Sequence, residues 1–163
     1  MKILLSGPPG TGKSHMGEWL QSHLGFAHVD MENWPSHVNK SLWVAGKYRE
    51  FVEELNSLGD NVALSWGFPP SRLDLVENLS VNGVVAIWLD APVVFCRRHW
   101  QPKTGQPEGD FIFQIEGICT IAKKLAQFYE GRSILVASPD FNHVGEAQIS
   151  EQINRICNYG NRT

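Results

Sequence analysis

The stretch Gly7-Pro8-Pro9-Gly10-Thr11-Gly12-Lys13-Ser14, which reads GPPGTGKS, decides the fold of this chain. It fits the pattern G-x-x-x-x-G-K-[ST] at every fixed position. The apolar run before it, Met1 to Ser6, predicts a buried strand, and the segment from Lys13 to Leu24 has the spacing of a helix. A strand, a glycine-rich loop and a helix in this order are what the motif requires.

The motif predicts a site for the phosphates of a nucleotide. Glycines let the loop curl so that successive N–H groups point inward, and the following helix directs its positive end at the same anion. Lys13 can reach the outer phosphates, and the hydroxyl of Ser14 can bind Mg²⁺. The residues expected to hold the nucleotide are Gly7, Pro9, Gly10, Thr11, Gly12, Lys13, Ser14 and His15. Two alternatives stay open: a glycine-rich turn in an ordinary α/β protein, and a solvent-facing place for His15.

Length and composition limit the class of protein. With 163 residues, 42% hydrophobic and 19% charged, the chain is expected to form one globular domain with a real core. A net charge of −3 argues against a nucleic acid or a membrane as partner, because both need basic residues. The three widely spaced cysteines indicate reduced thiols and a cytoplasmic protein. No apolar run is long enough to span a membrane, and the immediate first strand leaves no room for a signal peptide.

Strand and helix patterns alternate along the chain. The expected strands are 1–6, 26–30, 61–65, 84–89 and 133–137. The expected helices are 13–24, 36–58 (in one or two parts), 112–129 and 145–158. Two further helices are expected, one capped by Ser71 and one that begins at Ala91-Pro92. The polar stretch Gln101 to Asp110 predicts a mobile loop. Alternating strands and helices favour an α/β fold with a mostly parallel sheet and right-handed crossovers.

Asp30 ends the second predicted strand, and ligands of open parallel sheets gather outside the carboxyl ends of strands. A carboxylate there can bind Mg²⁺ or accept a proton from a substrate hydroxyl. A helix cap or a solvated loop carboxylate is the alternative, and it applies with more force to Glu32. Trp34, Trp66, Gly67 and Phe68 are expected to line the pocket of a second substrate, although core packing explains the aromatic side chains equally well.

The chain resembles the P-loop kinases of small metabolites and nucleotides, such as shikimate kinase, gluconate kinase and adenylate kinase, and the kinase-like AAA ATP-binding proteins. GPPGTGKS carries most of the resemblance. Segment 26–30 looks like their second strand, segment 64–69 is similar to the "LDGFPR" of adenylate kinases, and segment 88–98 resembles the strand and helix that lead into their lid. The resemblance implies a single domain over 1–163 with a lid loop around 99–112. It also implies a P-loop NTP hydrolase fold: a three-layer α/β/α sandwich whose five-stranded parallel sheet has the order 2-3-1-4-5.

The chain departs from these relatives in two places. Where they have an aspartate at the end of strand three, this chain has Ser65, so metal binding is expected to depend on Ser14 and Asp30. Relatives also carry several arginines across the lid, whereas Arg97 and Arg98 precede the loop here and Lys103 lies within it. The resemblance gives Arg97 or Arg98 the role of stabilising charge on the transferred group, and a surface salt bridge is the alternative for each.

The favoured function is therefore a kinase that transfers the γ-phosphate of ATP to a hydroxyl or phosphate of an unidentified small molecule, with Mg²⁺ as cofactor. The expected catalytic residues are Lys13, Asp30, Arg97 and Arg98. Two other functions compete with it: an ATPase or nucleotide-dependent switch with no acceptor, and a binding module without catalysis. A cytoplasmic monomer or homodimer is expected in each case.

Overall fold

A parallel sheet with β1 at its centre organises the computed structural model, which describes residues 1–32, 40–104, 108–138, 140 and 142–160. The strands in this part of the chain are β1 Lys2–Ser6, β2 Ala27–Asp30, β3 Val62–Ser65, β4 Val85–Asp90 and β5 Ser133–Leu135. Their order is β2-β3-β1-β4-β5, and every neighbouring pair is parallel. The predicted α/β class and the strand order 2-3-1-4-5 are confirmed.

The first strand is buried on both faces, as its continuous apolar sequence predicts. Ile3 and Leu5 point into one core and Leu4 into the other, because successive side chains of a strand alternate between faces. Leu4 is opposite Leu64 of β3 and Ala86 of β4. Burying one such leucine contributes about 1.5–3 kcal/mol, so β1 fixes the position of the glycine loop that follows it.

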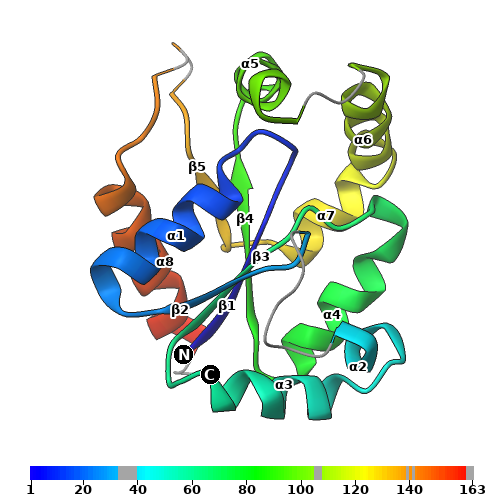
Figure 1. The fold of residues 1–163 in the computed structure, drawn as a ribbon. Helices are drawn as coiled ribbons and strands as arrows, with labels where there is room; N and C mark the ends of the chain where they lie inside the picture. Colours follow the sequence, from blue (N-terminus) through cyan, green and yellow to red (C-terminus); the bar gives the residue numbers. More distant parts are fainter. Residues whose placement is uncertain (33–39, 105–107, 139, 141, 161–163) are drawn as a thin grey trace.

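Helices cover both faces of the sheet and complete the predicted three layers (Figure 1). They are α1 Lys13–Leu24, α2 Lys40–Val44, α3 Tyr48–Ser57, η1 Pro70–Arg72 (a 3₁₀ turn), α4 Leu73–Val81, α5 Val93–Thr104, α6 Glu108–Thr120, α7 Ala122–Phe128 and α8 Glu146–Gly160. α1 and α8 pack on the core that contains Ile3 and Leu5, and α3, α4 and α7 pack on the core that contains Leu4. Within the described ranges, no helix has the length and apolarity to cross a bilayer.

One predicted alternative is confirmed, and two predicted elements differ from the structure. The described part of the 36–58 segment forms two helices, α2 and α3, as the two-part alternative predicted, and Gly46 separates them with a φ of 76°. The predicted helix 112–129 is interrupted at Ile121, whose φ of −110° and ψ of 15° leave helical geometry. Most of the predicted loop 101–110 is helical, since α5 continues to Thr104 and α6 begins at Glu108. Acidic residues in the first turn of α6 stabilise its positive N-terminal end. Trp100 of α5 and Phe111 of α6 also pack together in the core, with ring centroids 5.4 Å apart, so tertiary packing favours helix on both sides of the predicted loop.

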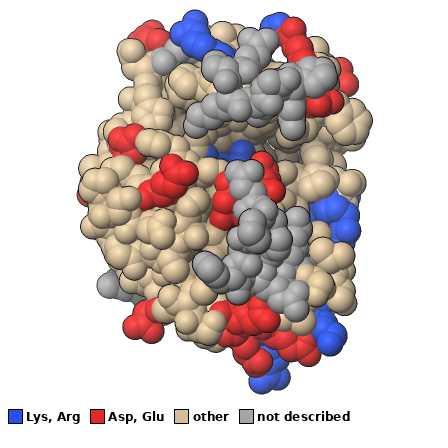
Figure 2. Space-filling view, viewed as in Figure 1, with Lys and Arg blue, Asp and Glu red and all other residues tan. Residues whose placement is uncertain are grey.

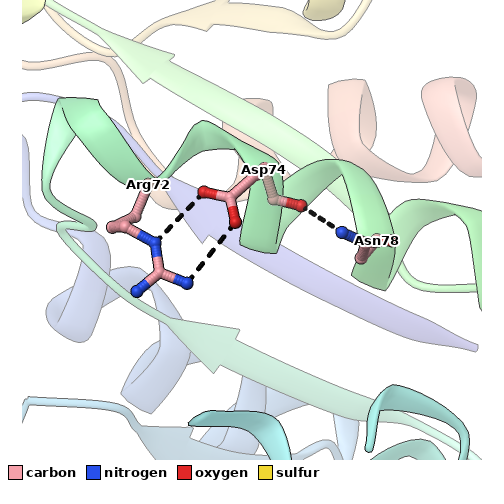
Figure 3. Close-up of polar contacts among 3 residues, drawn as sticks. All are labelled: Arg72, Asp74 and Asn78. Atoms are coloured by element: carbon pink, nitrogen blue, oxygen red, sulfur yellow. Dashed lines mark hydrogen bonds and ion pairs between the residues drawn. The ribbon is translucent and has the colours of Figure 1, made fainter. Parts of the chain in front are cut away.

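The predicted cap at Ser71 is also wrong, because Ser71 lies inside η1 and α4 follows Arg72 directly. A cation at a helix N-terminus is unfavourable by itself. Asp74 compensates for it by accepting hydrogen bonds from Arg72 Nε at 3.1 Å and Nη2 at 3.4 Å (Figure 3). Asn78 then donates to the Asp74 carbonyl one turn later, at 2.8 Å. This start of α4 holds the segment after β3 beside the carboxyl edge of the sheet.

Candidate active site

The glycine-rich loop connects β1 to α1 at the carboxyl edge of the sheet, where the motif predicted it. Gly10 and Gly12 have φ values of 84° and 83°, a region that other residues rarely adopt. A Cβ on Gly10 would lie 2.0 Å from the carbonyl oxygen of Cys96, and one on Gly7 would lie 2.2 Å from that of Leu89. The glycines therefore allow the loop to pack directly on the end of β4 and on α5. This packing supports the curled backbone that a phosphate-binding loop requires.

Lys13 folds back over this loop. Its Nζ donates to the carbonyl oxygens of Gly7 at 3.2 Å and Pro8 at 2.9 Å, and 9% of the residue is exposed. Burial lowers the pKa of Lys13, and the negative charge of Glu32 opposes that shift. The ammonium group is thus held by neutral carbonyls in a place with little solvent. An incoming phosphate would add a strong counter-charge to those that Glu32 and Asp30 already provide.

Ser14 and Asp30 meet beside the loop. Ser14 Oγ donates to Asp30 Oδ2 at 3.0 Å, and the backbone N–H of Glu32 donates to Asp30 Oδ1 at 2.9 Å. A hydroxyl and a carboxylate are the oxygen ligands that Mg²⁺ prefers, and magnesium keeps most of its shell from water and phosphate. The donor set therefore fits Mg²⁺. The sequence predicted both residues for this role, and the structure brings them together.

Glu32 is a site residue to which the sequence gave little weight. Its Oε1 accepts the backbone N–H of Gly67 at 2.8 Å, which ties the carboxylate to the segment after β3. A Cβ on Gly67 would lie 2.7 Å from Glu32 Oε1 and 3.6 Å from Lys13 Nζ. The carboxylate and the ammonium therefore approach each other where Gly67 leaves space. Its position two residues after Asp30 is the sequence signal that could have identified it.

A cleft of about 1400 Å³ extends from the glycine loop along this edge of the sheet. Figure 2 shows the hollow, with basic atoms at its floor and acidic atoms beside it. One part, here called the histidine half, is lined by His15, Phe95, His99, Trp100, His143 and Glu146. The other part, here called the aromatic half, is lined by Trp66, Phe68, Trp88, Phe113, Ile118 and Leu125. This volume is more than one drug-sized ligand needs, so the cleft has room for a nucleotide and a second molecule.

The histidine half lies on the α1, α5 and α8 side of the sheet. The ring of Phe95 lies 4.1 Å from that of His99 and 6.1 Å from that of His143, centroid to centroid, and the second pair is stacked. His15 Nε2 lies 2.8 Å from Glu146 Oε1, and this hydrogen bond lowers the pKa of the Glu146 carboxyl. His15, which the sequence placed in the nucleotide site, does line the cleft.

The aromatic half lies on the side of α4 and α7. The ring of Phe68 lies 5.5 Å from that of Trp66 and 6.3 Å from that of Trp88. Trp66 and Phe68 are largely buried, so core packing accounts for much of their surface. Even so, the predicted acceptor residues Trp66, Gly67 and Phe68 all line the cleft. Trp34, the fourth of them, lies outside the described residues.

The two predicted catalytic arginines are not brought to the cleft. Arg97 is half-exposed and forms an ion pair with Glu108, so it connects α5 to the first turn of α6. Arg98 is exposed, and neither arginine lines the cavity. Among the described lining residues, Lys13 is the single lysine or arginine. The salt-bridge alternative therefore describes Arg97 in this structure, and a catalytic role for either arginine remains a prediction.

Ser65, at the position of the missing aspartate, is buried and lies 3.0 Å from His28 Nε2 through its Oγ. Burial lowers the pKa of His28, which favours the neutral imidazole. A Cβ on Gly17 would lie 2.3 Å from this ring, so α1 packs directly against it. Ser65 of β3 thus binds the His28 side chain of β2 at the place where α1 packs on that ring.

No protein-family model matches the chain. Among curated proteins, mouse threonine synthase-like 1 is 31% identical over an aligned length of 103 positions. The match covers 56% of this chain and 14% of that relative's length.

Solved structures match over nearly the whole chain. Shikimate kinase from Acinetobacter baumannii, solved with shikimate, has a TM-score of 0.62 at 16% identity and covers 99% of this chain and 95% of its own. The tunicamycin resistance protein of Deinococcus radiodurans has a TM-score of 0.59 at 17% identity and covers 95% of each chain. A gluconokinase from Sinorhizobium meliloti has a TM-score of 0.56 at 17% identity and covers 97% of this chain and 91% of its own. The predicted resemblance to P-loop kinases is confirmed as a shared fold.

Proposed function

From a fold shared with the P-loop kinases, we propose that this chain is an ATP-dependent phosphotransferase that acts on a small molecule. One observation carries the proposal. Lys13, Ser14, Asp30 and Glu32 converge on one loop at the floor of a cleft with room for two ligands. A cation, a pair of metal-binding oxygens and a second carboxylate are the parts that phosphoryl transfer from ATP requires.

The glycine loop would hold the β- and γ-phosphates, with Lys13 neutralising the charge that develops on the transferred group. Ser14 and Asp30 would hold Mg²⁺, which supplies further charge neutralisation when bound. The base of the nucleotide would lie in the histidine half, where Phe95, His99 and His143 offer ring faces for stacking. Among the described residues, no arginine lines this half, so the base would depend on these rings for stacking.

Glu32 is the carboxylate best placed to act on the acceptor. The oxygens of Asp30 already accept hydrogen bonds from Ser14 and from the Glu32 N–H. The Glu32 carboxylate instead accepts the N–H of Gly67, which lines the aromatic half of the cleft. The acceptor hydroxyl would lose its proton to Glu32 as its oxygen attacks the γ-phosphorus. One P–O bond forms, the bond to the bridging oxygen breaks, and ADP carries away the electron pair. Of the two roles predicted for Asp30, the proposal keeps magnesium binding and gives proton acceptance to Glu32.

A coupled assay of ADP release tests the proposal. Purified protein is given Mg-ATP alone and then Mg-ATP with each of a panel of hydroxyl compounds, and ADP release is measured. We expect little turnover without an acceptor and at least tenfold more with a suitable one, because closure over both ligands favours transfer over hydrolysis. Absence of nucleotide binding in the same preparation, measured by calorimetry, would refute the proposal.

An acceptor-independent ATPase is the second candidate, and Ser65 favours it. A serine that contacts His28 at the end of β3 gives no carboxylate at that position. Turnover that is equal with and without every acceptor would support this candidate. Nucleotide binding without turnover in either assay would support a binding module.

A further inference from the structure

We propose that the aromatic half of the cleft binds a planar, apolar acceptor that carries no negative charge, and that α6 is the element that selects it. The inference rests on the proposed phosphotransferase function and adds the chemical class of the second substrate. It is carried by the face that α6 presents, by an exposed ring on that face and by the distribution of charge.

One face of α6 is directed at the cleft. Asp110, Phe113, Gln114 and Ile118 all line the cavity, and their spacing of three and four residues places them on one side of the helix. Gly117 lies on the same side, and a Cβ there would come within 2.9 Å of Pro70 Cγ. The glycine therefore lets α6 approach the segment after β3 closely. α6 and that segment form two walls of one slot.

An exposed ring on this face lacks a structural explanation. Phe113 is 76% exposed, although it lies beside a core whose other rings are mostly covered. Phe68 and Trp88 line the same half, and their rings are 6.3 Å apart. An aromatic side chain left open on a cavity wall is typical of a site that binds an apolar ring. A planar ligand in this slot would cover Phe113 and so remove its exposed surface from water.

The charges that line the slot disfavour the binding of a negatively charged acceptor. The charged groups at its boundary are the carboxylates of Glu32 and Asp110. Lys13, the single lysine or arginine among the described lining residues, already lies in the phosphate loop. Arg97 is paired with Glu108. Among the described residues, a carboxylate or phosphate on the acceptor would therefore meet like charge without a counter-ion, while a neutral or cationic hydroxyl compound would not.

Calorimetry with defined probes tests this inference. Wild-type protein saturated with Mg²⁺ and a non-hydrolysable ATP analogue is titrated with benzyl alcohol and 4-hydroxybenzyl alcohol, whose rings are planar and uncharged, and with gluconate and shikimate, which are anionic and not aromatic. We expect the planar pair to bind at least tenfold more tightly than the acids. Equal or tighter binding of the acids, or no binding of either planar probe at millimolar concentration, would overturn the inference. Saturation by the nucleotide analogue is checked first, so failure of the proposed function is seen separately.

Three variants connect the result to α6. Phe113→Ala is expected to raise the Kd for 4-hydroxybenzyl alcohol roughly three- to tenfold, the size of one lost ring contact. Phe113→Tyr keeps the ring and should restore most of the affinity. Ile112→Ala is the matched control, because Ile112 is 48% exposed on the same helix and does not line the cleft. An equal effect of Phe113→Ala and Ile112→Ala, or no rescue by tyrosine, would contradict the role of α6.

Discussion

The two halves of the cleft are built from opposite faces of the same sheet, and they differ in chemistry. The histidine half combines rings that can accept or donate protons with the carboxylate of Glu146. The aromatic half has tryptophan and phenylalanine walls with acids at its boundary. The phosphate loop lies between them. The contrast supports the proposal that two different ligands meet at the loop, which is the arrangement a transfer reaction requires.

The largest effect is expected at the boundary between the halves, where two carboxylates have different roles. Glu32→Gln should lower kcat by about 10²- to 10⁴-fold with little change in the magnesium requirement, since it removes a general base. Asp30→Asn should instead raise the Mg²⁺ concentration needed for half-maximal activity. Steady-state rates measured across magnesium concentrations separate the two. The reverse pattern would exchange the roles of the two residues.

A side chain at Gly10, in the loop between the two halves, should destabilise the folded protein. Gly10→Ala forces a Cβ to within 2.0 Å of the Cys96 carbonyl at a φ of 84°, so we expect a loss of about 1–3 kcal/mol in the free energy of unfolding. Gly25→Ala is the control, because its φ of 69° carries similar strain and its Cβ would have no neighbour within 4 Å. Urea unfolding measures both variants. Equal losses would mean that the packing of the loop on α5 does not matter.

A variant in the histidine half should weaken nucleotide binding and leave acceptor binding nearly unchanged. His143→Ala removes a ring that stacks on Phe95, and we expect the KM for ATP to rise roughly three- to tenfold. The KM for an acceptor should change by less than twofold. This is the mirror image of Phe113→Ala in the aromatic half. If His143→Ala weakens the acceptor instead, the assignment of the two halves is wrong.

The smallest effect is expected for the contact between His15 and Glu146. Because the folded-state pKa of Glu146 is lowered, its contribution to stability is present above the usual glutamate pKa of about 4.3 and is lost as the pH falls through the folded value. Glu146→Gln should cost up to about 1 kcal/mol at neutral pH, and less as the pH falls, because the pair is partly exposed. Thermal unfolding measured in steps from pH 7 down to pH 2 checks this. A difference from wild type that does not shrink anywhere below the usual glutamate pKa would contradict it.

The fold and the phosphate loop could be predicted because their signals are local. Gly7 to Ser14 specify the loop by residue type and spacing, and α1 begins and ends at Lys13 and Leu24, as its pattern indicates. Gly25 ends that helix with a φ of 69° and donates its N–H to the Leu20 carbonyl. Asp30 could be found for the same reason, because the end of a parallel strand is readable in the sequence.

The rest depends on contacts between distant residues, which no local pattern contains. Glu32 acquires its role from Gly67, 35 residues later, and Arg97 is directed away from the cleft by Glu108. The stretch 101–110 has the prolines and glycines of a loop, yet α5 and α6 extend into it because tertiary packing outweighs local preference. The cleft-lining face of α6 has helical spacing, but the sequence does not show what it faces.

The fate of the γ-phosphate tests the central claim most directly. Protein is incubated with Mg-ATP labelled in the γ-phosphate and with a planar hydroxyl compound that binds, and label on the acceptor is compared for wild type and Lys13→Ala. We predict transfer by wild type and a loss of at least about 100-fold in Lys13→Ala, since the lysine stabilises charge in the transition state. Far-UV circular dichroism should show that the variant remains folded. Undiminished transfer by folded Lys13→Ala would contradict the account.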